Sequence, residues 1–215
     1  MSTGSRFGLV SFDVDGTIFR QPALTTVSDD LGIGVKWHRY DDMFLHHRIT
    51  LGECLDKQFR LLSGLRLDLV LKLVSKVETV RNVRETVEKL QGHGLRVVLL
   101  TNNPDFLCAY LVDRFGFDGY VSSKIPVRDG VIGKDLVSMP EKLDGMKRYS
   151  RWTGVSLDRC AHIGDWINDI PVFQAVGYSI AFNAKQDRVK KAASCAMESD
   201  DLLAVYQHLL PMISQ

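Results

Sequence analysis

The sequence predicts an α/β fold, a Rossmann-like parallel sheet core with a small inserted helical cap domain. Short apolar runs, each followed by a polar turn, alternate with stretches of helical periodicity, as in sheets covered by helices on both faces. Residues 21–80 interrupt this alternation with several amphipathic helical patterns and no convincing strand, and the stretch is too long for a simple connection. We therefore assign residues 21–80 to the cap domain, and residues 1–20 and 81–215 to the core domain.

Four apolar runs are interpreted as buried parallel strands because they lack strict polar alternation. They are Phe7–Phe12, Leu95–Leu100, Cys160–Ile163 and Tyr178–Phe182. The spacing of Val83, Val87 and Leu90 predicts a helix before the second strand. After that strand, Asn103 and Pro104 predict the N-cap and the first turn of the next helix.

Local turn and capping signals predict the elements of the two insertions. In the cap, Thr50 and Glu53 form a capping box in front of an amphipathic helix, and a further helix is expected from Leu67 to Val80. The dipeptide Asp129-Gly130 between short apolar segments predicts a β-hairpin, which would be a second and smaller insertion.

The composition leaves small-molecule ligands open. The 27 basic and 26 acidic residues give a net charge of +1, which argues against a nucleic-acid binder that works through bulk charge. No apolar run approaches membrane length, so no membrane partner is expected. The cysteines lack metal-knuckle or redox spacing and are expected to be buried thiols in a reducing compartment: Cys54, Cys108, Cys160 and Cys195. We expect a cytoplasmic protein, as a monomer or a homodimer.

Polar residues follow three of the predicted strands. Asp13 and Asp15 end the first, Thr101 and Asn102 the second, and the segment Asp165–Asp169 follows the third. Because ligands of open parallel sheets gather at the carboxyl ends of the strands, these side chains should converge at one edge. If the strand is still extended at its tip, Asp13 and Asp15 lie side by side and need a cation or a shared proton between them.

Clustered carboxylates at a sheet edge suit Mg²⁺, so Asp13, Asp15 and Asp165 are the metal-ligand candidates. With a hydroxyl and a lysine nearby, such a site suits a phosphoryl group. We expect Asp13 to attack phosphorus and form an aspartyl-phosphate, and Asp15 to protonate the leaving alcohol and later deprotonate water. Thr101 and Lys142 are expected to hold the phosphate oxygens; Lys147 is a rival for the lysine.

Four segments together resemble the motifs of the haloacid-dehalogenase superfamily: Asp13–Thr17, Leu100–Asn102, Lys142 and Gly164–Asp169. Within it the chain is most similar to phosphoserine phosphatases, which carry a small helical cap after the first motif. The resemblance implies the superfamily's fold, with Asp13 as nucleophile and Asp165 as a metal ligand. It also implies that Asp15 is the general acid/base and binds the metal through its backbone carbonyl.

The resemblance extends to the substrate side of the site. It implies that Asp169 supports the water shell of the metal and that Asn168 helps to place the substrate. Thr101, Asn102, Lys142 and Asn168 are thus the expected phosphate- and substrate-binding residues.

The chain departs from the phosphoserine phosphatase pattern in its second motif, where Thr101-Asn102-Asn103 replaces Ser-Gly-Gly, and at two positions that would bind the substrate's charges. Pro22 stands where those enzymes have an acid for the substrate ammonium, and Gln58 where they have an arginine for its carboxylate. The sequence therefore predicts an Mg²⁺-dependent phosphomonoesterase that hydrolyses phosphoserine poorly and acts on another small phosphorylated metabolite, such as phosphoglycolate or a sugar phosphate.

Other functions of the same fold remain open to different degrees. A phosphomutase or phosphotransferase would use the same aspartyl-phosphate. A non-catalytic binding protein is disfavoured because Asp13 and Asp15 are both present, and a dehalogenase is disfavoured because it needs no acid at Asp15. His162, within the third strand, is interpreted as a core residue, and His46 and His47 as surface or packing residues.

Overall fold

A computed structural model describes residues 5–137 and 141–214 of the chain. Its centre is one six-stranded sheet in the order β3-β2-β1-β6-β7-β8, with every neighbouring pair parallel. The strands are β1 (Leu9–Phe12), β2 (Arg96–Pro104), β3 (Gly119–Ser123), β6 (Cys160–Gly164), β7 (Tyr178–Phe182) and β8 (Cys195–Met197). The core range assigned from sequence also includes residues 1–4, 138–140 and 215, which lie outside the described residues.

The four predicted strands are confirmed as β1, β2, β6 and β7. The sequence analysis missed β3 and β8, which form the two edges of the sheet. Both edge strands are mostly half-buried or exposed, so they carry no continuous apolar run. The signal that identified the inner strands is absent from the outer two.

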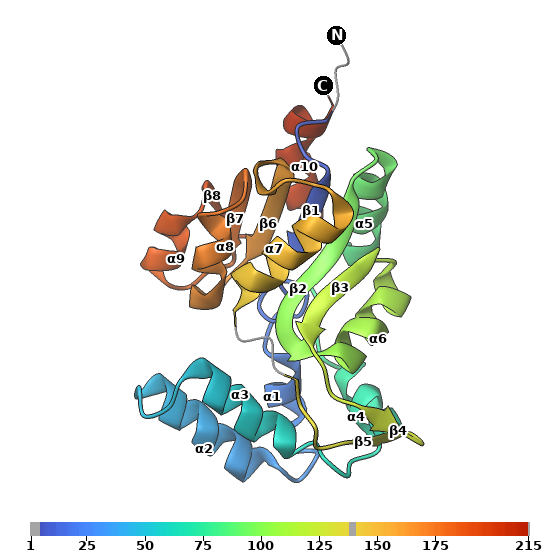
Figure 1. Cartoon of the computed structure of the whole chain (residues 1–215), viewed down its shortest axis with the longest axis vertical. Coiled ribbons are helices and arrows are strands. Elements are labelled where there is room, and N and C mark those ends of the chain that lie inside the picture. Colours follow the sequence, from blue (N-terminus) through green and yellow to red (C-terminus); the bar gives the residue numbers. More distant parts are fainter. Residues whose placement is uncertain (1–4, 138–140, 215) are drawn as a thin grey trace.

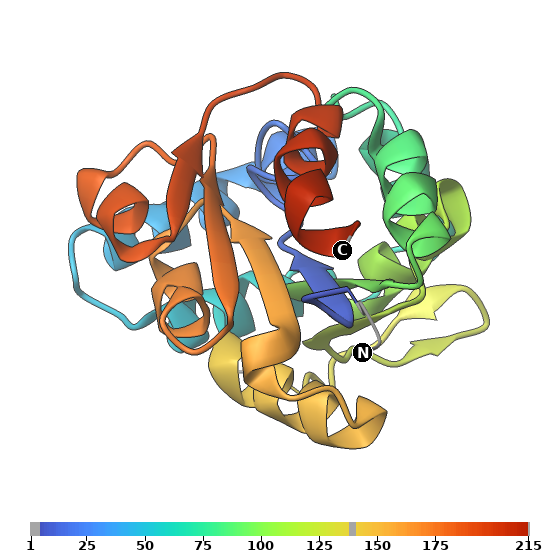
Figure 2. The ribbon, with the colours of Figure 1, turned by 90° about the horizontal axis from the view of Figure 1, so that it is seen from above.

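Helices cover both faces of the sheet (Figure 2). On one face, α5 (Val83–Gly92), α6 (Asp105–Phe115) and α10 (Leu203–Ile213) pack in one apolar cluster with the inner strands. On the other face lie α7 (Lys142–Thr153), α8 (Ile170–Phe173) and α9 (Asp187–Ala192), with the short 3-10 helices at Leu157–Arg159 and Ile167–Asp169. The alternation of side chains along β1 sends Val10 to the first cluster and Leu9 to the second.

The residues assigned to the cap from the sequence form α1 (Ala23–Val27), α2 (Gly34–Leu45), α3 (Leu51–Arg60) and α4 (Leu67–Val74), and these helices lie at the end of the molecule opposite α10 (Figure 1). The capping box is confirmed: Thr50 N donates to Glu53 Oε2 at 2.8 Å, and Glu53 N to Thr50 Oγ1 at 3.2 Å. The helix predicted to run to Val80 is shorter and ends at Val74. The residues after it return to the core, where Val80 N donates to Ile18 O at 2.9 Å.

The predicted hairpin is present as β4 (Val127–Arg128) and β5 (Val131–Ile132). Asp129 and Gly130 have φ values of 51° and 75°, as a two-residue type I′ turn requires. The hairpin lies against the cap (Figure 1), since Leu67 N donates to Gly130 O at 2.8 Å and Ile132 N to Leu65 O at 3.0 Å.

Two features of the composition can be compared with the structure. The four cysteines are free thiols, three of them buried and Cys195 half-buried. Among the helices described, none combines the length and the apolarity needed to cross a bilayer.

Candidate active site

The candidate site lies at the carboxyl ends of the central strands β2, β1 and β6. The strand order reverses at β1, because β2 lies on one side of it and β6 on the other. Asp13 follows β1 directly, and its backbone N–H donates to Ile163 O at 2.8 Å. Asp165 follows β6. Crevices at such reversal points are the usual ligand sites of open parallel sheets.

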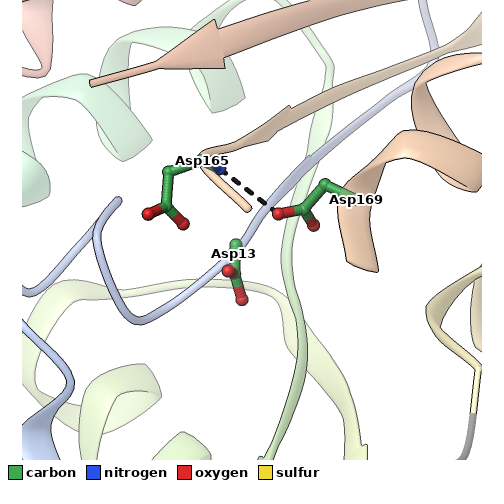
Figure 3. Close-up of side chains that lie close together, drawn as sticks. All are labelled: Asp13, Asp165 and Asp169. Atoms are coloured by element: carbon green, nitrogen blue, oxygen red, sulfur yellow. Dashed lines mark hydrogen bonds between the residues drawn. The ribbon is translucent and has the colours of Figure 1, made fainter. Parts of the chain in front are cut away.

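Three carboxylates gather at this edge of the sheet (Figure 3). Asp13, Asp165 and Asp169 each offer one oxygen, and these atoms all lie within 4.8 Å of one another. Burial raises the pKa of Asp13 to about 7, although Lys142 opposes the shift. Burial, together with Asp13 and Asp169, raises the pKa of Asp165 to about 8. Asp13 and Asp165 therefore take up protons readily unless a cation replaces them.

Lys142 is the first residue of α7 and is only 2% exposed. Its Nζ lies 2.8 Å from Asp13 Oδ1 and 2.6 Å from Asp169 Oδ1. Burial by itself would lower the pKa of Lys142, but these two carboxylates raise it above its ordinary value. Lys142 is thus a charged lysine within the site, whereas its rival Lys147 is exposed on the same helix.

Asp169 is fully buried and uses both of its carboxylate oxygens as acceptors. Oδ1 accepts from Lys142 Nζ and from His162 Nε2, the latter at 2.9 Å. Oδ2 accepts from the backbone N–H groups of Asp165 at 3.2 Å and of Trp166 at 3.1 Å. Burial would raise the pKa of Asp169, but Lys142 and His162 hold it well below its ordinary value. Asp169 therefore stays ionised and fixes the loop that follows β6.

The backbone conformation of Gly16 and its closeness to Asp165 show why the first motif has a glycine after its second aspartate. Its φ is +75°, a conformation that favours glycine. A Cβ at this position would lie 2.1 Å from Asp165 Oδ2, so a side chain would displace that carboxylate.

Asp15 is held apart from the three-carboxylate cluster. β1 ends at Phe12, so Asp13 and Asp15 do not follow the two-residue alternation of a strand. The carboxylates that cluster with Asp13 are those of Asp165 and Asp169, and the expected pairing of Asp13 with Asp15 does not form the cluster. Asp15 Oδ1 accepts from Ala23 N and Oδ2 from Asn103 Nδ2, each at 2.9 Å. Burial raises the pKa of Asp15, and both donors oppose this shift.

The second and fourth motifs meet through two asparagines. Asn168 Nδ2 donates to Asn102 Oδ1 at 3.0 Å. Asn168 Oδ1 is buried and has no hydrogen-bond partner in the described part of the chain, which leaves an acceptor for a ligand. Thr101, also buried, lies beside them near the end of β2.

The cluster fits a hard cation. Its donors are all carboxylate oxygens, the set that Mg²⁺ prefers. Asp165 Oδ1 is buried without a hydrogen-bond partner among the described residues, as expected of an oxygen reserved for a metal. Asp169 already accepts four hydrogen bonds, so it suits a supporting position better than a direct ligand.

Comparison with known proteins agrees with this geometry. The family model described as haloacid dehalogenase-like hydrolase matches residues 10–174, which include all of the site residues above. The chain belongs to the haloacid dehalogenase-like hydrolase family.

Relatives within this hydrolase family match over most of their length. The chain is 23% identical over 205 residues to the phosphoserine phosphatase of Methanocaldococcus jannaschii, covering 94% of this chain and 97% of the relative. It is 25% identical over 204 residues to that of Lactococcus lactis subsp. lactis, covering 93% and 94%. A substrate-bound phosphoserine phosphatase complex shares the fold, with a TM-score of 0.80 and 20% identity over 97% of this chain and 99% of that one.

Sequence reasoning misjudged Asn103 in this hydrolase and did not foresee one contact of His162. Asn103 was predicted to cap a helix, but Pro104 occupies the N-cap of α6 and the Asn103 side chain donates to Asp15 instead. The strand β2 extends to Pro104, which turns Asn103 towards the site. His162 is a buried core residue as predicted, yet it also donates to Asp169. The contact of Asn103 with Asp15 joins residues 88 positions apart, so no local pattern signals it. His162 and Asp169 are only seven positions apart, but their contact depends on the loop that follows β6.

Proposed function

We propose that the chain is an Mg²⁺-dependent phosphomonoesterase that acts on a small phosphorylated metabolite through an aspartyl-phosphate on Asp13. The observation that carries the proposal is the pairing of Asp13 with Lys142 Nζ, 2.8 Å from Oδ1, at the carboxyl end of the central strand and beside an acidic cluster. Transfer of a phosphoryl group depends mainly on positioning and charge neutralisation, and this arrangement supplies both. The similarity to phosphoserine phosphatases supports the same reaction class.

Each half of the reaction uses Asp13 and Asp15. In the first, a carboxylate oxygen of Asp13 attacks phosphorus, the bond from phosphorus to the ester oxygen breaks, and Asp15 gives its proton to the leaving alkoxide. In the second, Asp15 takes a proton from water as that water attacks phosphorus and releases Asp13. Lys142 offsets the charge of Asp13 and, with Thr101 and Asn102, holds the phosphate oxygens.

The proposed metal ligands are those that the family resemblance implies, and the buried Oδ1 of Asp165, without a partner among the described residues, supports this set. Asp13, Asp165 and the backbone carbonyl of Asp15 would hold Mg²⁺, and Asp169 would support its water shell. When bound, the ion would neutralise charge on the carboxylates and on the phosphate. Asn168, whose buried Oδ1 has no partner among residues 5–137 and 141–214, would accept a hydrogen bond from the substrate.

The cap argues against a zwitterionic substrate. Gln58 is only 3% exposed, and its Nε2 donates to Asp41 Oδ1 at 2.7 Å and to Trp37 O at 3.3 Å. Its amide is therefore committed within the cap and carries no charge for a carboxylate. Pro22, at the N-cap of α1, offers none for an ammonium. We propose a phosphate ester without an amino-acid head group, such as phosphoglycolate or a sugar phosphate.

A phosphate-release screen tests the proposal. Phosphoserine, phosphoglycolate and several sugar phosphates are incubated with the protein in Mg²⁺ and in EDTA, and the products are identified so that transfer to a second hydroxyl is recognised. We expect hydrolysis that requires Mg²⁺ and is abolished in Asp13→Asn, because an amide keeps the shape but loses the nucleophile. Asp113→Asn, at an exposed position of α6, is the matched control and should keep full activity. Near-normal hydrolysis by Asp13→Asn would refute the mechanism.

A further inference from the structure

The Asn103 side chain connects the second motif to Asp15. Asn103 is 8% exposed, and its Nδ2 donates to Asp15 Oδ2 at 2.9 Å and to Thr101 Oγ1 at 3.2 Å. Its backbone N–H also donates to Thr101 Oγ1, at 3.3 Å. An amide this buried, with both of its hydrogen atoms directed at named acceptors, has one well-defined orientation.

Two donors hold the Asp15 carboxylate from opposite parts of the molecule. Oδ1 accepts from the backbone N–H of Ala23, the first residue of α1 in the cap, and Oδ2 accepts from Asn103 in the core. A single hydrogen bond leaves a carboxylate free to turn about its own axis, whereas one on each oxygen fixes its plane. Among the described residues, Asn103 is the one whose side chain makes such a bond to Asp15.

We infer that Asn103 is a positioning residue for proton transfer by Asp15, an inference that rests on the proposed function. Each carboxylate oxygen offers two acceptor directions, so the two donors leave one on each oxygen, aimed in a fixed direction, for the transferred proton. That proton passes from Asp15 to the ester oxygen as the bond to phosphorus breaks, and a proton of water later returns to Asp15. Asn103 keeps its own protons throughout. Without Asn103, Asp15 is correctly oriented for a smaller fraction of the time.

The dependence of the rate loss on the basicity of the leaving group distinguishes a role in proton transfer from a role in phosphate binding. An alkyl phosphate needs a proton on its departing oxygen, whereas an activated aryl phosphate needs little help. A defect that acts through Asp15 therefore grows with the pKa of the leaving alcohol. A defect that acts through Thr101, the other partner of the amide, would weaken phosphate binding by the same factor for every ester.

The experiment measures kcat and KM of Asn103→Ala and of the isosteric Asn103→Leu over a series of esters from 4-nitrophenyl phosphate to an alkyl phosphate. We expect kcat/KM, which reports the steps up to formation of the aspartyl-phosphate, to fall less than about threefold for the nitrophenyl ester and about 10- to 100-fold for the alkyl ester, the range for loss of a hydrogen bond to a charged group. Thr101→Val serves for comparison: it removes one acceptor of the Asn103 amide but leaves the bond to Asp15, so we expect a loss common to every ester and a smaller dependence on the leaving group than in the Asn103 variants. Circular dichroism establishes that each variant is folded.

Parallel measurements on Asp15→Asn distinguish the possible failures. If Asp15→Asn depends on the leaving group while both Asn103 variants lose the same factor for every ester, the positioning role is overturned and the proposed function stands. If Asp15→Asn itself shows no such dependence, the acid role of Asp15 fails and the inference fails with it. If either folded Asn103 variant shows the dependence, the inference is supported, so misfolding of the other does not decide the question.

Discussion

His162 Nε2 lies 2.9 Å from Asp169 Oδ1, and both side chains are fully buried. Since the carboxylate only accepts, the imidazole carries a hydrogen on Nε2. The other ring nitrogen, Nδ1, lies 2.9 Å from Ser11 Oγ. Asp169 in turn binds Lys142, which binds Asp13. A line of buried polar contacts thus runs from the inside of the sheet to the candidate nucleophile.

Replacing His162 should disturb the site through Asp169. We expect His162→Leu to lose about 1.5 to 3 kcal/mol of unfolding free energy, because a buried charged group loses a hydrogen bond, and to lower kcat at least tenfold. His162→Gln can place an N–H donor near the same point and should recover much of both. His47→Asn, at an exposed residue with φ of 56°, is the control. Urea unfolding of His162→Leu within about 0.5 kcal/mol of the parent would contradict this account.

Lys142 and Lys147 offer a matched pair on α7. Lys142→Met leaves two buried carboxylates without their cation, so we expect a loss of about 3 to 5 kcal/mol in unfolding free energy and of nearly all activity. Lys147→Met changes an exposed side chain and should alter stability by less than about 0.5 kcal/mol. Equal losses in the two variants, measured by urea unfolding, would show that the buried ion pairs have no special importance.

The metal-free protein should become less stable as the pH rises towards 8. The pKa values of Asp13 and Asp165 are raised from 3.8 to about 7 and about 8. Between the ordinary and the raised values the folded state holds more protons than the unfolded chain, so its stability falls as the pH rises through that window. We expect a decrease on the order of a few kcal/mol, measured by urea unfolding in EDTA. If the unfolding free energy did not change from about pH 5 to about pH 8, ionisation of these two carboxyl groups would not destabilise the folded state.

Asp169 should affect the pH dependence of stability in the opposite direction to Asp13 and Asp165. Its pKa is held below the ordinary value, so its contribution to stability is present above the ordinary carboxyl pKa and is lost only in acid.

Mg²⁺ should stabilise the fold more at high pH than at low pH. The ion competes with protons for the carboxylates, so the rise in Tm on adding Mg²⁺ should be larger at about pH 8 than at about pH 5. Asp165→Asn removes the negative charge of the carboxylate whose Oδ1 has no partner in the described structure, and should remove most of that rise. Asp113→Asn should keep it. A full Mg²⁺ response in Asp165→Asn, measured by thermal unfolding, would place the metal elsewhere.

Phosphoserine should be a poor substrate. Each missing charge-assisted contact, at Pro22 and at Gln58, removes on the order of 1.5 to 3 kcal/mol of recognition, which together amounts to roughly two to four powers of ten. The measurement is the kcat/KM of phosphoserine relative to phosphoglycolate and several sugar phosphates at the same Mg²⁺ concentration. If phosphoserine exceeds all of them by about a hundredfold, the cap recognises the zwitterion through other residues.

The inner sheet and the acidic edge could be predicted from the sequence because their signals are local. A parallel strand covered on both faces needs a continuous apolar run, and the residue that follows it lies at the ligand-binding edge wherever the strand is placed in the sheet. Asp13 and Asp165 were located in this way. The capping box at Thr50 and the turn at Asp129-Gly130 are equally local.

Only the tertiary structure decided which partners these residues have. Asn103 meets Asp15 across 88 positions of the chain, and His162 meets Ser11 across 151. The side-chain amide of Gln58 donates to Asp41 on the neighbouring helix α2 and is therefore not available to a ligand. Local sequence encodes the propensity to form a strand, turn or cap, but a buried polar side chain takes whichever partner the packing of distant segments brings within hydrogen-bond reach.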